Sequence, residues 1–166
     1  MIVTQSVTDL STLADHSRIW VFQSSKVLQG DMRTEISSKL IAFLKGWAAH
    51  GQSLFAAFEI KLDRFIVIAV DEEMAQATGC SVDKLMHTVQ AIDDQHSLDL
   101  LNRMKVAYRS GEDILECDVN SFTQMLKSGE LDDSTFVFNN VVQTLGEFKM
   151  SWETTVKNSW HANLLP

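Results

Sequence analysis

The 166-residue sequence lacks most of the features that mark secreted, membrane-spanning and disulfide-bonded proteins. It has only two cysteines, Cys80 and Cys117, and they form no CxxC pair, which favours free thiols in a reducing compartment. The longest apolar run, residues 65–70, is too short to cross a bilayer as a helix. The first residues have neither a basic segment nor a sustained apolar run, so the sequence predicts no signal peptide. We therefore expect a cytoplasmic protein with no membrane partner.

Positive charge is also scarce, because 14 Lys and Arg residues stand against 22 Asp and Glu residues, for a net charge of −8. Binding to a phosphate backbone needs clustered basic residues, so we expect no nucleic-acid partner. The only proline is Pro166, and there is no low-complexity segment or internal repeat, so nothing indicates a rigid linker. Hydrophobic residues make up 45% of the chain, which is enough for the core of one domain, with or without an extension.

What the sequence does contain is an alternation of short apolar segments and amphipathic helices. Alternating or wholly apolar segments predict strands at residues 18–23, 54–62, 65–70 and 104–109. Apolar residues at helical spacing predict helices at residues 30–51 and 81–92, the second capped by Ser81. The order β-α-β-β-α-β predicts an α/β protein with a ferredoxin-like split sheet over residues 18–110. Residues 1–17 would be a loose N-terminal lead-in.

The pattern of residues 111–166 predicts a C-terminal β-α-β extension that packs on this core. Its helix would be capped by Asp118 and stopped by Gly129. The predicted central strand, residues 65–70, is apolar on both faces, so the face that the helices leave open also needs a cover. We expect the tail from residue 111 to supply that cover. A second subunit is the alternative, so the protein would be a monomer or a homodimer.

A cysteine next to a predicted helix start is the main candidate for catalysis. The dipole and the free N–H groups of a helix N-terminus can stabilise the thiolate of Cys80. Asp83 and His87 share one face of that helix, and His50 lies near the end of the preceding helix. However, Cys80 and His87 are about two turns apart, roughly 10 Å along the axis. A surface Asp–His pair beside a capped helix explains these residues as well, so Cys80, Asp83, His50 and His87 are weak catalytic candidates.

Six further residues are weak ligand-binding candidates, each with an ordinary structural explanation such as a core aromatic, a turn or a strand-end arginine. They are Trp47, Arg64, Asn139, Asn140, Trp160 and His161. The five histidines show no HExxH motif, no closely spaced pair and no finger spacing, so the sequence predicts no metal site. The phosphate-binding patterns GxGxxG and GxxxxGK[ST] are absent as well. We therefore expect no cofactor and no P-loop ATPase activity.

Several short segments together resemble a known family. They are Trp47-Ala48-Ala49-His50-Gly51, Gly79-Cys80-Ser81-Val82-Asp83-Lys84, Val137-Phe138-Asn139-Asn140 and Ser159-Trp160-His161. The family comprises small uncharacterised bacterial proteins that are often labelled "ABC transporter ATPase" automatically, and the resemblance runs from about Arg18 to Leu164. It implies no catalytic residues. The pattern Phe-x3-Leu-x2-Gly-x-Leu-x3-Thr-x-Val, residues 122–137, is similar to the helix and following strand of GYF-like interaction modules.

Three hypotheses about function follow from the sequence. The first is a non-catalytic α/β protein that binds an unknown protein or small-molecule partner, because the known cofactor and metal motifs are missing. The second is a cysteine-dependent enzyme that uses Cys80 at a helix N-terminus. The third is an adaptor that binds a peptide through its C-terminal extension.

Overall fold

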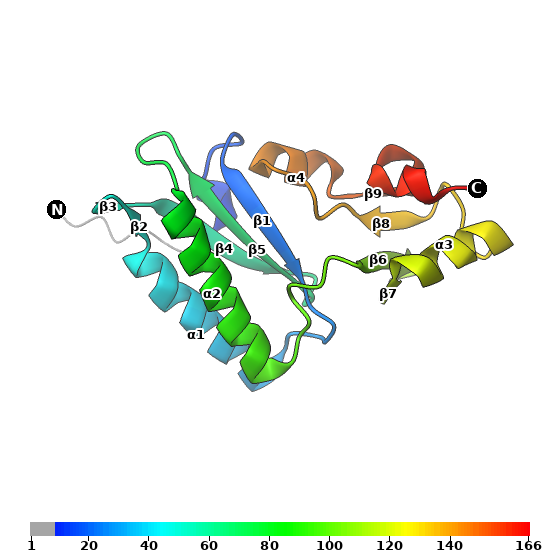
Figure 1. The fold of residues 1–166 in the computed structure, drawn as a ribbon, viewed down its shortest axis with the longest axis horizontal. Coiled ribbons are helices and arrows are strands. Elements are labelled where there is room, and N and C mark those ends of the chain that lie inside the picture. Colours follow the sequence, from blue (N-terminus) through cyan, green and yellow to red (C-terminus); the bar gives the residue numbers. More distant parts are fainter. Residues whose placement is uncertain (1–8) are drawn as a thin grey trace. The chain divides into compact units, whose positions relative to one another are not determined.

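The computed structural model describes residues 9–166 and shows a mixed α/β fold, which confirms the predicted class (Figure 1). The chain divides into two compact units. The first unit holds the chain up to Leu101 together with Gln143–Gly146, and the second holds Asn102–Val142 and Glu147–Pro166. Of the predicted lead-in, residues 1–8 lie outside the described residues. None of the helices in the described part of the chain is both long and apolar enough to span a membrane.

The first unit contains two α-helices and an antiparallel sheet in the order β1-β5-β4. Its elements are η1 (Leu10–Thr12), β1 (Arg18–Gln23), α1 (Gly30–Gly46), β2 (Ala48–Ala49), β3 (Gln52–Ser53), β4 (Phe55–Lys61), β5 (Phe65–Asp71) and α2 (Gly79–His96). Strand β5 is central because its residues 65–70 are apolar on both faces, and all six are fully buried. The register sets Trp20 and Phe58 on either side of Ile68.

One face of β5 packs against the apolar stripes of α1 and α2. The core cluster on this side includes Ile66, Ile68 and Val70 from β5, Ile36, Leu40 and Leu44 from α1, and Leu85, Val89 and Ile92 from α2. Both helices differ from the prediction at their ends. Helix α1 ends at Gly46 rather than near Gly51, which lies in the β2–β3 turn with a φ of 76°. Helix α2 begins earlier, because the Thr78 hydroxyl accepts the backbone N–H of Ser81 and so caps the helix in place of Ser81.

The other face of β5 carries Phe65, Val67 and Ala69, which are fully buried too. Residues 9–17, which we predicted as part of a loose lead-in, instead pack on this unit, because Leu10 and Leu13 are buried and η1 contacts β4. We expected the tail from residue 111 to cover this face. The part of that tail that belongs to the first unit is Gln143–Gly146. This stretch runs beside the outer edge of β1, where Arg18 forms a β-bridge with residue 144.

The second unit contains a separate antiparallel sheet in the order β7-β6-β8-β9. Its elements are β6 (Lys105–Ser110), β7 (Asp113–Asp118), α3 (Val119–Ser128), β8 (Phe136–Phe138), β9 (Glu153–Thr155), η2 (Val156–Asn158) and η3 (Trp160–Leu164), and α4 (Leu145–Ser151) begins in the first unit and continues here. The predicted boundaries of α3 are confirmed, since Asp118 caps it and Gly129, with a φ of 79°, ends it. Helix α3 packs on β6 through Phe122 and Tyr108, whose ring centroids are 5.7 Å apart.

This second sheet changes the predicted topology. We expected residues 104–109 to be the fourth strand of a ferredoxin-like sheet, but β6 pairs with β7 along its full length and with β8 on its other side. The sheet of the first unit therefore has three strands among the described residues, and residues 102–110 belong to the second unit. The β6–β7 part of this arrangement is local. A two-residue turn, in which Gly111 has a φ of 62°, joins β6 to β7, and such a short loop loses little chain entropy on closing.

Candidate cation-binding site

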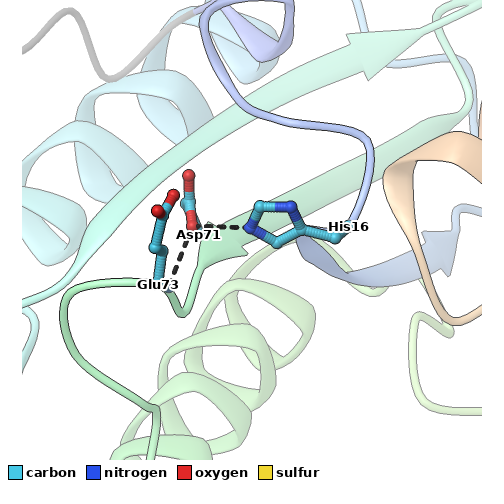
Figure 2. A group of neighbouring side chains, drawn as sticks. All are labelled: His16, Asp71 and Glu73. Carbon is cyan, nitrogen blue, oxygen red and sulfur yellow. Dashed lines mark hydrogen bonds and ion pairs between the residues drawn. The ribbon is translucent and has the colours of Figure 1, made fainter.

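Three side chains that can bind a metal converge in the first unit at the end of β5 (Figure 2). His16 comes from the segment before β1, Asp71 is the last residue of β5, and Glu73 follows in the connection to α2. Each offers one ligand atom, and these atoms all lie within 4.8 Å of one another. The imidazole ring of His16 points toward the Asp71 carboxylate in Figure 2.

The Asp71 carboxylate interacts with both of the other residues of this cluster. Its Oδ1 atom lies 3.1 Å from His16 Nε2 and also accepts the backbone N–H of Glu73 at 2.9 Å. The Asp71 side chain is 14% exposed, whereas the His16 side chain is 59% exposed, and Glu73 is an exposed residue. One carboxylate is therefore held in place while the other two groups face solvent, from which a cation could reach them.

Strand pairing explains why residues so far apart in the sequence meet here. Arg18 lies opposite Val70 in the antiparallel β1–β5 pair, so the residues just before Arg18 run past the residues just after Val70. Ser17 is fully buried, and its N–H donates to the Ala14 carbonyl at 3.0 Å in a tight turn. Together the register and the turn bring His16 next to the end of β5.

These three groups could hold a first-row transition metal. One imidazole with two carboxylates is typical of zinc and related cations, and three protein ligands leave a further position open. The imidazole binds a metal through an unprotonated nitrogen. A cation would therefore replace the hydrogen bond that now joins His16 and Asp71. From the sequence we predicted no metal site, because His16 is one of five histidines without a metal-ligand spacing and Asp71 lies 55 positions away from it.

The predicted catalytic residues do not form a comparable cluster. The start of α2 does meet the end of α1, because Trp47 Nε1 donates to the Ser81 carbonyl at 2.9 Å and Ser81 Oγ donates to the Ala48 carbonyl at 3.1 Å. These contacts do not include the four candidates. Cys80, Asp83, His50 and His87 are all exposed, and within residues 9–166 no hydrogen bond or ion pair joins any two of them.

The predicted ligand-binding residues mostly have structural roles. Trp47 is buried in the core of the first unit, and Arg64 closes the β4–β5 hairpin through its backbone N–H. Asn139 and Asn140 both bind Trp152. The Asn139 N–H donates to the Trp152 carbonyl at 2.6 Å, and the Asn140 Oδ1 accepts from Trp152 Nε1 at 2.9 Å. These contacts hold the turn after β8, as the ordinary interpretation of Asn139-Asn140 predicts.

Trp160 and His161 anchor the C-terminal segment of the second unit. Their rings stack with centroids 4.0 Å apart, and His161 meets the Phe122 ring edge-on at 5.9 Å. His161 is 1% exposed, and this burial lowers the pKa of its imidazole to about 4, so the ring is neutral at pH 7.

Ser159 lies beside His161 in the turn between η2 and η3. Its Oγ is 2.7 Å from His161 Nδ1 and 3.2 Å from the Val156 carbonyl. A hydroxyl has one proton. When Ser159 donates that proton to Val156, it can only accept a hydrogen bond from Nδ1–H. The pair therefore stabilises the turn.

No family model, no curated protein and no solved structure matches this chain. The resemblance to the bacterial family and to GYF-like modules therefore stays a prediction from the sequence.

Proposed function

We propose that this protein is a non-catalytic binding protein whose ligand is a first-row divalent cation such as Zn²⁺, bound by His16, Asp71 and Glu73. The observation that supports the proposal is the convergence of the three groups at the end of β5, where their ligand atoms lie within 4.8 Å of one another. Within residues 9–166 no hydrogen bond or ion pair joins any two of the four catalytic candidates, and this favours a binding role over cysteine-dependent catalysis. The free thiols of Cys80 and Cys117 agree with a cytoplasmic location.

Charge balance favours a cation over a simple ion pair at this site. The contact of His16 with Asp71, at 3.1 Å, involves only one of the two carboxylates. A dication compensates both carboxylates while the imidazole binds in its neutral form. The nitrogen ligand also sets the metal preference, because Mg²⁺ and Ca²⁺ favour sites made wholly of oxygen atoms.

Isothermal titration calorimetry of the full chain tests the proposal. We expect Zn²⁺ to bind to a single site, and each of His16→Gln, Asp71→Asn and Glu73→Gln to weaken its affinity by at least about tenfold. His87→Gln and Asp83→Asn are matched controls, since both residues are exposed on α2, and neither should change the affinity. Zinc binding that survives all three site substitutions would contradict the proposal, and so would equal affinity for Mg²⁺.

A further inference from the structure

The backbone of residues 15–19, around His16, forms hydrogen bonds with residues 143–146, a distant part of the chain. The Ser17 carbonyl accepts the N–H of Leu145 at 2.9 Å, and the Asp15 carbonyl accepts the N–H of Gly146 at 2.8 Å. Slightly further on, the Ile19 N–H donates to the Gln143 carbonyl at 3.2 Å. Residues 15–19 therefore hold residues 143–146 through their backbone, while the side chain of His16 reaches toward the end of β5.

The fit between the two segments is close. A Cβ atom added to Gly146 would lie 3.3 Å from both the Cβ and the carbonyl oxygen of Asp15, which is tighter than an ordinary contact. Leu145 is 1% exposed, so its side chain is buried where the segment docks. Of the chain beyond Asn102, residues 143–146 are the part that belongs to the first unit. The contact therefore joins two stretches of the first unit that lie far apart in the sequence.

We propose that cation occupancy at His16, Asp71 and Glu73 regulates the docking of residues 143–146 on residues 15–19, an inference that rests on the proposed function. A bound cation ties His16 to β5 and so restrains the carbonyls of its two chain neighbours, Asp15 and Ser17. Without a cation, His16 is held to β5 by one hydrogen bond on a largely exposed ring. Local opening of residues 15–17 then needs less free energy, and the bonds to Leu145 and Gly146 open with it.

Coupling of this kind is reciprocal, because a ligand that favours the docked state is itself bound more tightly by that state. Weakening the docking at Gly146 should therefore weaken zinc binding, although Gly146 is not one of the proposed ligands.

Amide hydrogen exchange of the full chain, with and without Zn²⁺, tests this inference. We expect zinc to slow the exchange of the Ile19, Leu145 and Gly146 amides by about fivefold or more, and to leave the α3 amides unchanged. The slowing should vanish in His16→Gln. Gly146→Val should lower the zinc affinity, whereas Gly46→Val, a control at a helical glycine with open space around it, should not.

The outcomes separate the two proposals. If zinc binds through His16, Asp71 and Glu73 but the exchange of these amides is unchanged, the regulatory inference is overturned and the proposed function stands. If the chain does not bind zinc, both are overturned.

Discussion

Acid should destabilise the protein through the buried imidazole of His161. Burial holds the pKa of His161 at about 4 in the folded state, whereas the unfolded chain has the ordinary value near 6.5. Between these two pKa values the unfolded chain binds a proton that the folded chain does not bind, so a fall in pH favours unfolding. The stability that the neutral His161 ring contributes is fully present above pH 6.5, falls progressively as the pH drops toward 4, and does not change further below that pH.

The size of the effect follows from the pKa difference. From pH 7 to pH 5 the expected loss is at most about 2 kcal/mol of unfolding free energy, at about 1.4 kcal/mol for each pH unit between the two pKa values. Other groups act in a different range. Hydrogen bonds from serines lower the pKa values of Asp9, Asp118 and Asp132 below 3.8, so the stability that they contribute is lost only in stronger acid.

Urea denaturation at pH 7, 6 and 5, without added metal, measures this loss. In His161→Phe the titrating group is gone while an aromatic ring remains beside Phe122 and Trp160, so the loss between pH 7 and pH 5 should shrink by up to about 2 kcal/mol. His87→Phe, a substitution at an exposed position on α2, is the control and should keep the wild-type dependence on pH. Identical pH dependence in wild type and His161→Phe would refute the reasoning.

Two further predictions concern backbone strain and thiol reactivity. Gly129→Ala should lower the unfolding free energy by about 1 kcal/mol, because Gly129 has a φ of 79°, which strains a residue with a Cβ atom. Gly46→Ala, in α1 with open space around it, is the control and should not lower the unfolding free energy. Equal losses in thermal or urea unfolding would contradict this prediction. Iodoacetamide should label exposed Cys80 faster than Cys117, because burial raises the pKa of the Cys117 thiol. If Cys80 reacted far faster than a cysteine in a short unstructured peptide, the non-catalytic proposal would be in difficulty and the enzyme hypothesis would gain support.

Local patterns predicted much of the fold. The strands near residues 18–23 and 65–70 were predicted from β-branched and apolar residues, and the limits of α3 from Asp118 and Gly129, because these signals act within a few residues of each other. Errors occurred where neighbouring groups competed. Thr78 caps α2 although Ser81 is also a good capping residue, because the Thr78 hydroxyl accepts the backbone N–H of Ser81 and so places Ser81 inside the first turn.

The candidate cation-binding site could not be predicted from local patterns. No spacing motif links His16 to Asp71 and Glu73, and the residues meet only because Arg18 pairs with Val70 in the register of β1 and β5. A register depends on the whole hydrophobic pattern of both strands and on their turns, and a shift by one residue would turn every side chain to the opposite face.

Hydrophobic periodicity and helix caps are properties of contiguous residues, so they were enough to predict the α/β class, the buried central strand at residues 65–70 and the boundaries of α3. That β6 joins β7 and β8 in a second sheet, and that His16 meets Asp71, became visible in the folded chain alone. Strand partners such as β6 and β8, and side-chain clusters such as His16 with Asp71, depend on contacts between residues far apart in the chain, which no local pattern records.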